Sequence, residues 1–94
     1  MRQVRFAVEV PGAKKVLLAG DFTGWEKEAR PMRRSRSGGA FVATVGLPEG
    51  RHEYKFIVDG RWAVDPQAES VPNPFGTQNS VVTVDEAPAR RRAA

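Results

Sequence analysis

The sequence predicts an all-β domain, an antiparallel β-sandwich, and three observations support this. Apolar and polar residues alternate along several short segments, which is the pattern of half-buried strands. Glycines and prolines recur between those segments as turn formers. No segment keeps the i, i+3, i+4 apolar spacing of an amphipathic helix for more than one turn. A chain of 94 residues has the size of one domain.

The expected strands follow one another at short intervals. Apolar residues alternate with polar ones over residues 4–10, and Pro11-Gly12 ends this strand. Residues 16–19 form a short apolar run before Gly20, whereas residues 21–39 are polar and irregular. Further strands are expected over residues 41–45, 52–58, 62–64 and 81–84. Short strands separated by turns in this way are typical of a β-sandwich.

The pair Asp59-Gly60 predicts a hairpin with a two-residue loop, because a type I′ turn needs positive φ at both central positions. We interpret Asp59 as a turn former. In this register Ile57 faces Trp62, and side chains alternate between the two faces of the sheet. The outer face is then expected to carry Lys55, Ile57, Trp62 and Val64, and the core face Tyr54, Phe56, Val58 and Ala63.

Both tryptophans of the chain lie at turns. Trp25 follows Gly24, and Trp62 comes shortly after the Asp59-Gly60 turn. A ring in such a position lies near the end of a sheet and can face outward. Two such rings close together would form a flat apolar platform on which sugar rings can stack. We therefore expect both rings to be exposed on one face, within the reach of a few glucose units of each other.

The segment 73–80 allows two interpretations. Phe75 lies beside Gly76, and Thr77 and Asn79 follow immediately before the last expected strand. The segment can be an ordinary loop with a Pro-Phe-Gly turn. It can equally be an aromatic tip whose donors and acceptors match vicinal sugar hydroxyls, and composition alone leaves both open.

The composition excludes several classes of function. The chain has no cysteine and one histidine, which excludes thiolate catalysis and multi-histidine metal centres. Serine nucleophiles have only His52 as a possible base, and no Gly-x-Ser-x-Gly motif occurs. We therefore expect no enzyme activity, metal or cofactor. No apolar run approaches the roughly 20 residues of a membrane span and none resembles a signal peptide, so a cytoplasmic protein is expected.

The net charge of +4 comes largely from two basic stretches. Arg90-Arg91-Arg92 lies within residues 86–94, which combine Ala, Pro and Arg without periodicity. We expect residues 1–85 to form the folded domain and residues 86–94 a disordered basic tail. Residues 33–39 are a second basic stretch with the composition of a loop. Both stretches can be simply solvated or can contact an anionic partner, so nucleic-acid binding is a minor alternative.

Several motifs, in this order and spacing, resemble carbohydrate-binding module family 48. They are Phe22-x-x-Trp25, Leu47-Pro48-Glu49-Gly50, Tyr54-Lys55-Phe56-Ile57-Val58-Asp59-Gly60-x-Trp62, Asp65-Pro66 and Gly76-Thr77-x-Asn79. The chain especially resembles the glycogen-binding domain of the AMP-activated protein kinase β subunit. It is also similar to the early-set N-terminal domains of isoamylases and branching enzymes. The resemblance covers roughly residues 4–84.

This resemblance implies an immunoglobulin-like (early-set) sandwich that binds α-1,4-glucans without catalysis. In the kinase type two tryptophans stack on glucose rings, and these positions fall on Trp25 and Trp62. Contacts to sugar hydroxyls are implied for Lys55, Thr77 and Asn79.

The implied partners are α-glucan polysaccharides or oligosaccharides and a glycogen-metabolising enzyme or kinase. The sequence departs from the family at a few positions: Phe75 replaces a projecting leucine, and Thr23-Gly24 stand where asparagines often precede the first tryptophan. The alternative function is a protein-interaction or scaffolding domain of the same fold with weak or lost sugar binding.

Overall fold

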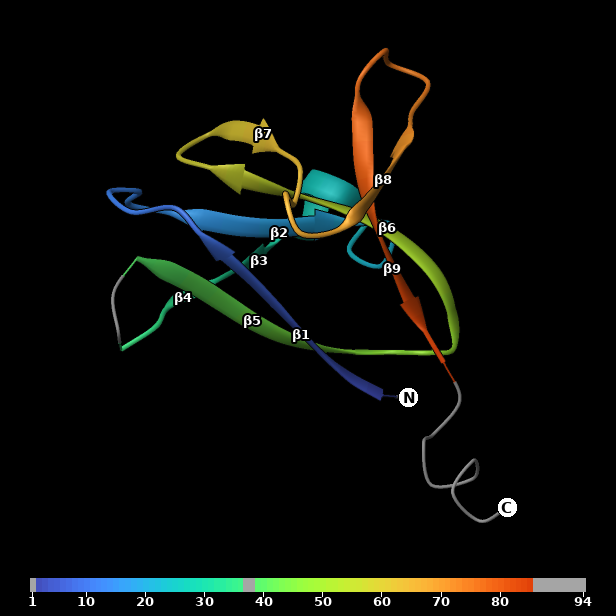
Figure 1. Cartoon of the computed structure of the whole chain (residues 1–94), viewed down its shortest axis with the longest axis horizontal. Coiled ribbons are helices and arrows are strands. Elements are labelled where there is room, and N and C mark those ends of the chain that lie inside the picture. Colours follow the sequence, from blue (N-terminus) through green and yellow to red (C-terminus); the bar gives the residue numbers. More distant parts are fainter. Residues whose placement is uncertain (1, 37–38, 86–94) are drawn as a thin grey trace.

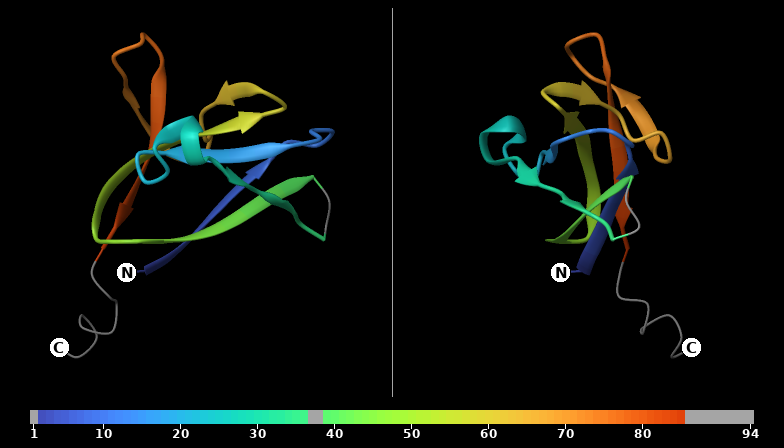
Figure 2. Two further views of the ribbon diagram at one scale, coloured as in Figure 1. Left: turned by 180° about the vertical axis from the view of Figure 1, so that it is seen from behind. Right: turned by 90° about the vertical axis from the view of Figure 1, so that its left-hand side faces the viewer.

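A computed structural model describes residues 2–36 and 39–85, which fold into two antiparallel sheets packed as a sandwich (Figures 1 and 2). The predicted all-β class is confirmed. Helical structure in the described residues is confined to a single 3-10 turn, η1 (Trp25–Glu28). No helix in this part of the chain is long and apolar enough to cross a membrane.

The smaller sheet has three strands in the order β1-β5-β4. Its two long strands are β1 (Arg2–Glu9) and β5 (Ala40–Leu47), and β4 (Arg33–Arg34) is a short edge strand. Val4, Phe6 and Val8 face the core from β1, which is the alternation that the sequence predicts. This sheet forms the side of the molecule that carries none of the six sequence-predicted site residues.

The larger sheet is built around β6 (Gly50–Val58). One edge of β6 pairs with β2 (Val16–Gly20), and β2 pairs with β3 (Arg30–Pro31). Along the other edge, β9 (Gln78–Val84) pairs with the first half of β6 and β7 (Arg61–Ala63) with the second half. β8 (Glu69–Pro72) completes the sheet beyond β9.

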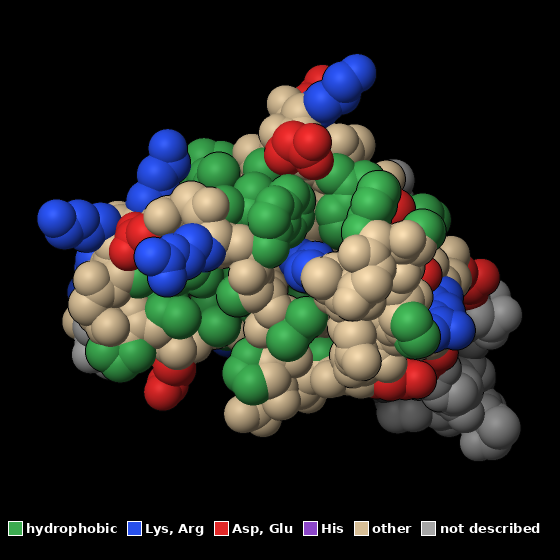
Figure 3. Space-filling model, turned by 90° about the horizontal axis from the view of Figure 1, so that it is seen from above, with side chains coloured by type: hydrophobic (Ala, Val, Ile, Leu, Met, Phe, Trp, Pro, Cys, Tyr) green, Lys and Arg blue, Asp and Glu red, His purple; other side chains and the backbone are tan. Residues whose placement is uncertain are grey.

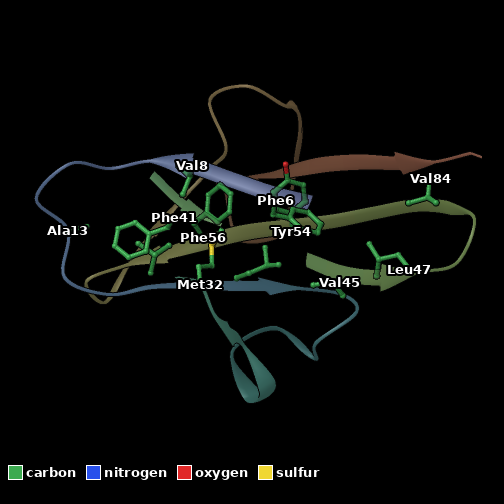
Figure 4. Packing of buried hydrophobic residues seen from close by; sticks show 12 residues of the cluster. Phe6, Val8, Ala13, Met32, Phe41, Val45, Leu47, Tyr54, Phe56 and Val84 are labelled. Atoms are coloured by element: carbon green, nitrogen blue, oxygen red, sulfur yellow. The ribbon is translucent and has the colours of Figure 1, made fainter. Parts of the chain in front are cut away.

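The core fills the space between the sheets with aromatic and aliphatic side chains (Figure 4). Phe6 from the smaller sheet meets Tyr54 from the larger one edge to face, with ring centroids 4.8 Å apart. Tyr54 in turn contacts Phe56, which is fully buried. Edge-to-face aromatic pairs of this kind contribute beyond their buried area, so these rings join the two layers.

The hairpin between β6 and β7 has the predicted register. Phe56 pairs with Ala63, Ile57 with Trp62 and Val58 with Arg61. Asp59 and Gly60 have φ of 50° and 88°, as a type I′ turn requires. The Asp59 carboxylate also accepts the backbone N–H groups of Lys14 and Lys15, at 2.9 and 2.8 Å. Its role as a turn former is therefore confirmed, although β7 ends at Ala63 instead of Val64.

The prediction of an irregular segment over residues 21–39 is wrong in part. η1, β3 and β4 all lie within it. Arg33 and Arg34 pair with β5, and the Arg34 guanidinium donates to the Ala13 carbonyl at 2.7 Å. The guanidinium carbon also lies 4.8 Å from the centroid of the Phe41 ring. Arg34 therefore contacts the domain although it is exposed, and the interpretation of this stretch as a loop is wrong for β4.

β8 also lacks a counterpart among the expected strands. Its residues are mostly exposed, so the burial that produces an alternating pattern is absent. Backbone pairing with β9 holds it in the sheet. The expected tail, residues 86–94, lies outside the described residues, as do residues 37–38 of the basic stretch.

Candidate functional site

An open depression of about 890 Å³ lies on the outer face of the larger sheet. Its walls come from the loop that leads into η1, from β6 and β7, and from the loop between β8 and β9. These elements lie together on the upper side of the molecule in Figure 1, and Figure 3 shows hydrophobic, acidic and basic side chains gathered on that side. The depression is lined by all six predicted site residues, Trp25, Trp62, Lys55, Phe75, Thr77 and Asn79.

The two tryptophan rings meet in this depression. Their centroids are 6.5 Å apart and their planes are inclined by 60°. Trp62 is 47 % exposed on the outer face of β7, as the hairpin register predicts. Trp25 is only partly exposed, so the expectation of two strongly exposed rings holds for Trp62 alone. Together the rings form a bent apolar surface instead of a flat platform.

The loop before Trp25 is tightly constrained. Trp25 itself has φ of 62°, which is unusual for a large side chain. The buried Thr23 Oγ1 lies 2.9 Å from the Trp25 carbonyl oxygen and 3.1 Å from the Gly20 carbonyl oxygen, so its single proton can be donated to one of them at a time, and it accepts the Gly20 N–H at 3.0 Å. A side chain at Gly20 would place its Cβ 2.8 Å from the Glu53 carbonyl oxygen, so glycine lets this loop lie against β6.

Strain at a residue such as Trp25 typically costs on the order of 1–3 kcal/mol and persists where the surrounding structure fixes it. Here Thr23 supplies the hydrogen bonds and Gly24, with φ of 68°, supplies the turn. Thr23-Gly24, the departure from the family pattern, thus has a structural role. It orients the Trp25 ring toward the depression.

Lys55 lies on the outer face of β6, as predicted, but it is only 9 % exposed. Its Nζ lies 5.8 Å from the centroid of the Trp62 ring and donates to Thr77 Oγ1 at 3.3 Å. A cation over an indole ring is attracted by the negative face of the ring. The Lys55 ammonium is therefore held between an aromatic wall and a polar loop.

Asn73 organises the loop between β8 and β9. Its Oδ1 accepts the N–H groups of Phe75 and Thr77, at 3.0 and 3.1 Å. Its Nδ2 donates to Thr77 Oγ1 at 2.8 Å and to Asn79 Oδ1 at 2.9 Å. This arrangement leaves Phe75 at the tip of the loop with 89 % of its surface exposed. An exposed aromatic residue on an ordered loop agrees with both interpretations of this segment.

Asn79 is 6 % exposed, and its Nδ2 donates to Glu53 Oε1 at 2.9 Å. Sequence reasoning missed both Glu53 and Asn73. The signal for Glu53 was available, because Glu53 lies two residues before Lys55 and so shares its face of β6. Asn73 precedes Pro74 in a turn, and asparagine commonly hydrogen-bonds the backbone two residues further along.

The buried side of β6 serves stability. The Tyr54 hydroxyl donates to Asp65 Oδ2 at 2.7 Å, and the Asp65 N–H donates to the Ser80 hydroxyl at 2.7 Å. Burial raises the pKa of the Tyr54 hydroxyl well above its ordinary value, and the hydrogen bond and charge of Asp65 raise it further. These contacts anchor the segment after β7 to β9, behind the depression.

The arrangement combines an aromatic surface with convergent polar groups. Within residues 2–36 and 39–85, no three or more His, Asp or Glu side chains cluster in a way that could hold a metal ion. Over residues 3–90 the chain matches the family described as the glycogen recognition site of AMP-activated protein kinase. The chain belongs to this family. The match includes every residue described above for the depression, and it confirms the family resemblance.

Several curated proteins are similar to this member of the glycogen-recognition family. It is 45 % identical to the β-1 subunit of 5′-AMP-activated protein kinase from Homo sapiens and 47 % identical to that from Bos taurus, each over 73 residues. The β-2 subunit from Mus musculus is 41 % identical over the same length. Each alignment covers 78 % of this chain but 26 % of the relative.

The chain thus spans about a quarter of the length of these relatives. Its family is defined by recognition instead of catalysis, in agreement with the prediction that the chain is not an enzyme.

Proposed function

We propose that this chain is a non-catalytic domain that binds α-1,4-glucans such as glycogen or starch chains in the depression. The observation that carries the proposal is the pair of indole rings, 6.5 Å apart, that line the same depression as Lys55 and Thr77. Family membership supports the same function, since the family is described as a glycogen recognition site.

The inclined rings suit a curved ligand. Successive rings of an α-1,4-linked glucan turn relative to one another, whereas a β-1,4-linked chain is straight. Indole planes inclined by 60° can therefore stack on neighbouring or nearby glucose units of a curved chain. Phe75, projecting from the loop between β8 and β9, offers a third apolar contact to that chain.

The polar groups supply hydrogen bonds to sugar hydroxyls. Thr77 Oγ1 already accepts from Lys55 Nζ and Asn73 Nδ2. Because a hydroxyl oxygen has two lone pairs, the proton of Thr77 remains for donation to a ligand. Lys55 carries further N–H groups, and Asn79 retains one amide hydrogen beyond its bond to Glu53. All three residues thus act chiefly as donors.

A calorimetric titration with maltoheptaose tests the proposal, with cellohexaose as the straight-chain control. We expect maltoheptaose to bind with a dissociation constant between micromolar and millimolar, roughly 4–8 kcal/mol. Cellohexaose should bind much more weakly. Equal affinity for the two sugars, or no binding of maltoheptaose, would contradict the proposal.

The relatives are named as subunits, and we extend the proposal to a partner. The chain would bring an associated kinase or glycogen-metabolising enzyme to the glucan that the chain binds. We place this function in the cytoplasm, since a chain without cysteine suits its reducing conditions. The exposed Phe75 keeps a protein-interaction domain as a second candidate function. If Phe75 contacts a protein and no sugar, Phe75→Ser will leave maltoheptaose affinity unchanged, whereas the glucan proposal expects it to fall.

A further inference from the structure

The hydrogen bonds along the floor of the depression run in one direction. Asn73 fixes this direction, because its Oδ1 receives two backbone N–H groups and its Nδ2 must therefore face Thr77 and Asn79. Asn79 then presents Oδ1 to Asn73 and Nδ2 to Glu53. The amide orientations follow from the backbone contacts of Asn73, which only one orientation satisfies.

Because the hydrogen bonds run in this direction, the groups that remain available to a ligand at Thr77 and Lys55 are donors. Thr77 and Lys55 have protons to give once their internal bonds are counted. A sugar hydroxyl both accepts and donates a hydrogen bond. A site that offers only donors would therefore remove water from the sugar hydroxyls without giving their protons an acceptor. An unpaired polar group there costs free energy. A complete glucan site therefore needs an acceptor near these donors.

Glu53 is placed to be that acceptor. It lines the depression, and it is half-buried. Its Oε1 accepts from Asn79, whereas its Oε2 has no hydrogen-bond partner within residues 2–36 and 39–85. Two residues along one strand face are separated by about 7 Å, so Glu53 and Lys55 can contact hydroxyls of the same sugar. Asp21 also lines the depression, but its carboxylate is occupied by the Glu53 N–H and lies 3.7 Å from His52 Nδ1.

We propose that Glu53 binds the glucan directly, accepting a hydrogen bond from a sugar hydroxyl with the carboxylate oxygen that Asn79 leaves unused. This inference rests on the proposed function. It adds to the donors Lys55 and Thr77 the acceptor that completes recognition of a vicinal hydroxyl pair.

The variant Glu53→Gln separates direct contact from positioning. Its Oε1 can still accept from Asn79, but its NH₂ group, held outward by that bond, cannot accept from a hydroxyl. We expect maltoheptaose affinity to fall about tenfold, since hydrogen bonds to charged groups are among the stronger ones. Glu53→Ala should lose at least as much. Thermal unfolding of Glu53→Gln should match that of the unmodified chain.

Glu9→Gln is the matched control, because it removes the same charge from β1 of the other sheet. It should leave affinity unchanged. If Glu53→Ala binds weakly and Glu53→Gln binds normally, Glu53 only positions Asn79, and the inference is wrong. It is also wrong if Glu53→Gln binds normally and Glu26→Gln, which alters a further carboxylate lining the depression, weakens binding.

Normal binding by the unmodified chain, lost in Trp62→Ala but kept in both Glu53 variants, would overturn this inference alone. Absence of maltoheptaose binding by the unmodified chain would overturn the proposed function together with it.

Discussion

At the scale of single residues, the solvent exposure of an aromatic side chain distinguishes a binding role from a role in the core. Trp62 is 47 % exposed and lies beside the Lys55 ammonium. Phe56 precedes Ile57, the cross-strand partner of Trp62, and it faces the opposite side of the sheet and is fully buried. The same hairpin thus supplies one aromatic ring to the surface and another to the core, because side chains alternate along a strand.

We predict that Trp62→Ala abolishes measurable maltoheptaose binding and leaves the fold intact. Truncating a central aromatic anchor often costs about 2 kcal/mol or more of binding free energy, a large share of the roughly 4–8 kcal/mol expected in total. An exposed ring should cost stability far less than the roughly 3–5 kcal/mol of emptying a core site. Calorimetry and thermal unfolding of the same variant provide the two measurements.

Lys55→Ala serves as the comparison for that variant. It should weaken binding less than Trp62→Ala, because it removes polar contacts and leaves the rings in place. Severe loss of thermal stability in Trp62→Ala without a specific loss of binding would identify Trp62 as a core residue.

Tyr54 gives a prediction about alkaline pH. Its pKa is raised in the folded state by burial and by Asp65, so the folded protein retains the phenolic proton where the unfolded chain releases it. The contribution of Tyr54 to stability is therefore fully present below about pH 10, the ordinary pKa of tyrosine, and is lost as the pH rises above it. Since Tyr54 is the sole tyrosine, tyrosinate absorbance should appear together with unfolding. Ionisation in the folded protein near pH 10 would contradict this.

At the scale of elements, the sequence is most informative where burial and turn chemistry coincide. The hairpin of β6 and β7 has both: an Asp-Gly turn and an alternating strand, which together predict its register. β3, β4 and β8 lack the alternating burial. They are two to four residues long, mostly exposed and held in their sheets by backbone pairing with the adjacent strands.

The same limit applies to the site. Trp62 and Lys55 could be placed on one face by alternation alone, and Trp25 was expected beside Trp62 from its position at a turn. Composition left the role of Phe75, Thr77 and Asn79 open, and the family resemblance assigned them to the site. Asn73 was missed because its role depends on four hydrogen bonds within a folded loop. The partial burial of Trp25 and its left-handed backbone could not be predicted either, since the sequence around Thr23 and Gly24 specifies neither of them.

We predict that Asn73→Ala loosens the loop between β8 and β9 and lowers maltoheptaose affinity several-fold. The variant removes two acceptor bonds to the backbone and two donor bonds to Thr77 and Asn79. Loss of such a cluster should destabilise the domain by about 1–3 kcal/mol. Denaturant unfolding and calorimetry measure the two effects.

Asn73→Asp is the control for this loop. Its carboxylate can still accept the Phe75 and Thr77 N–H groups, but it cannot donate to Thr77 Oγ1 or Asn79 Oδ1. Its stability should therefore lie between those of the unmodified chain and Asn73→Ala. Affinity equal to that of the unmodified chain in both variants would show that the loop does not depend on Asn73 to contact the glucan.

At the scale of the whole molecule, much of the net positive charge comes from residues that do not line the depression. The net charge is +4, yet three of the arginines lie in residues 90–92. β9 ends on the lower side of the molecule in Figure 1, away from the loop that carries Phe75 (Figure 1). The depression itself mixes acidic and basic side chains and presents aromatic rings. This distribution suits a neutral ligand better than a polyanion.

Ionic strength distinguishes the two ligand classes. We predict that maltoheptaose affinity changes less than about twofold between 50 and 200 mM salt, because stacking and hydrogen bonding to a neutral sugar release no counterions. Binding to a nucleic acid through 6–10 phosphate contacts would instead weaken by about 10³–10⁵ over that range. If the affinity of the chain for maltoheptaose fell steeply as salt was raised, the result would favour an anionic partner.

The last prediction concerns the basic tail, residues 86–94. We predict that a chain ending at Asp85 keeps both its melting temperature and its maltoheptaose affinity. The tail consists of Ala, Pro and Arg after Glu86, so it has little apolar surface whose burial could offset the entropy of ordering it. β9, which precedes the tail, ends on the lower side of the molecule in Figure 1, away from the loop between β8 and β9. Since the family match extends to residue 90, a second chain ending at Arg90 separates the two halves of the tail. Loss of stability on removing residues 86–90 would place the domain boundary beyond Asp85, whereas loss of affinity alone would mean that the arginines reach the glucan.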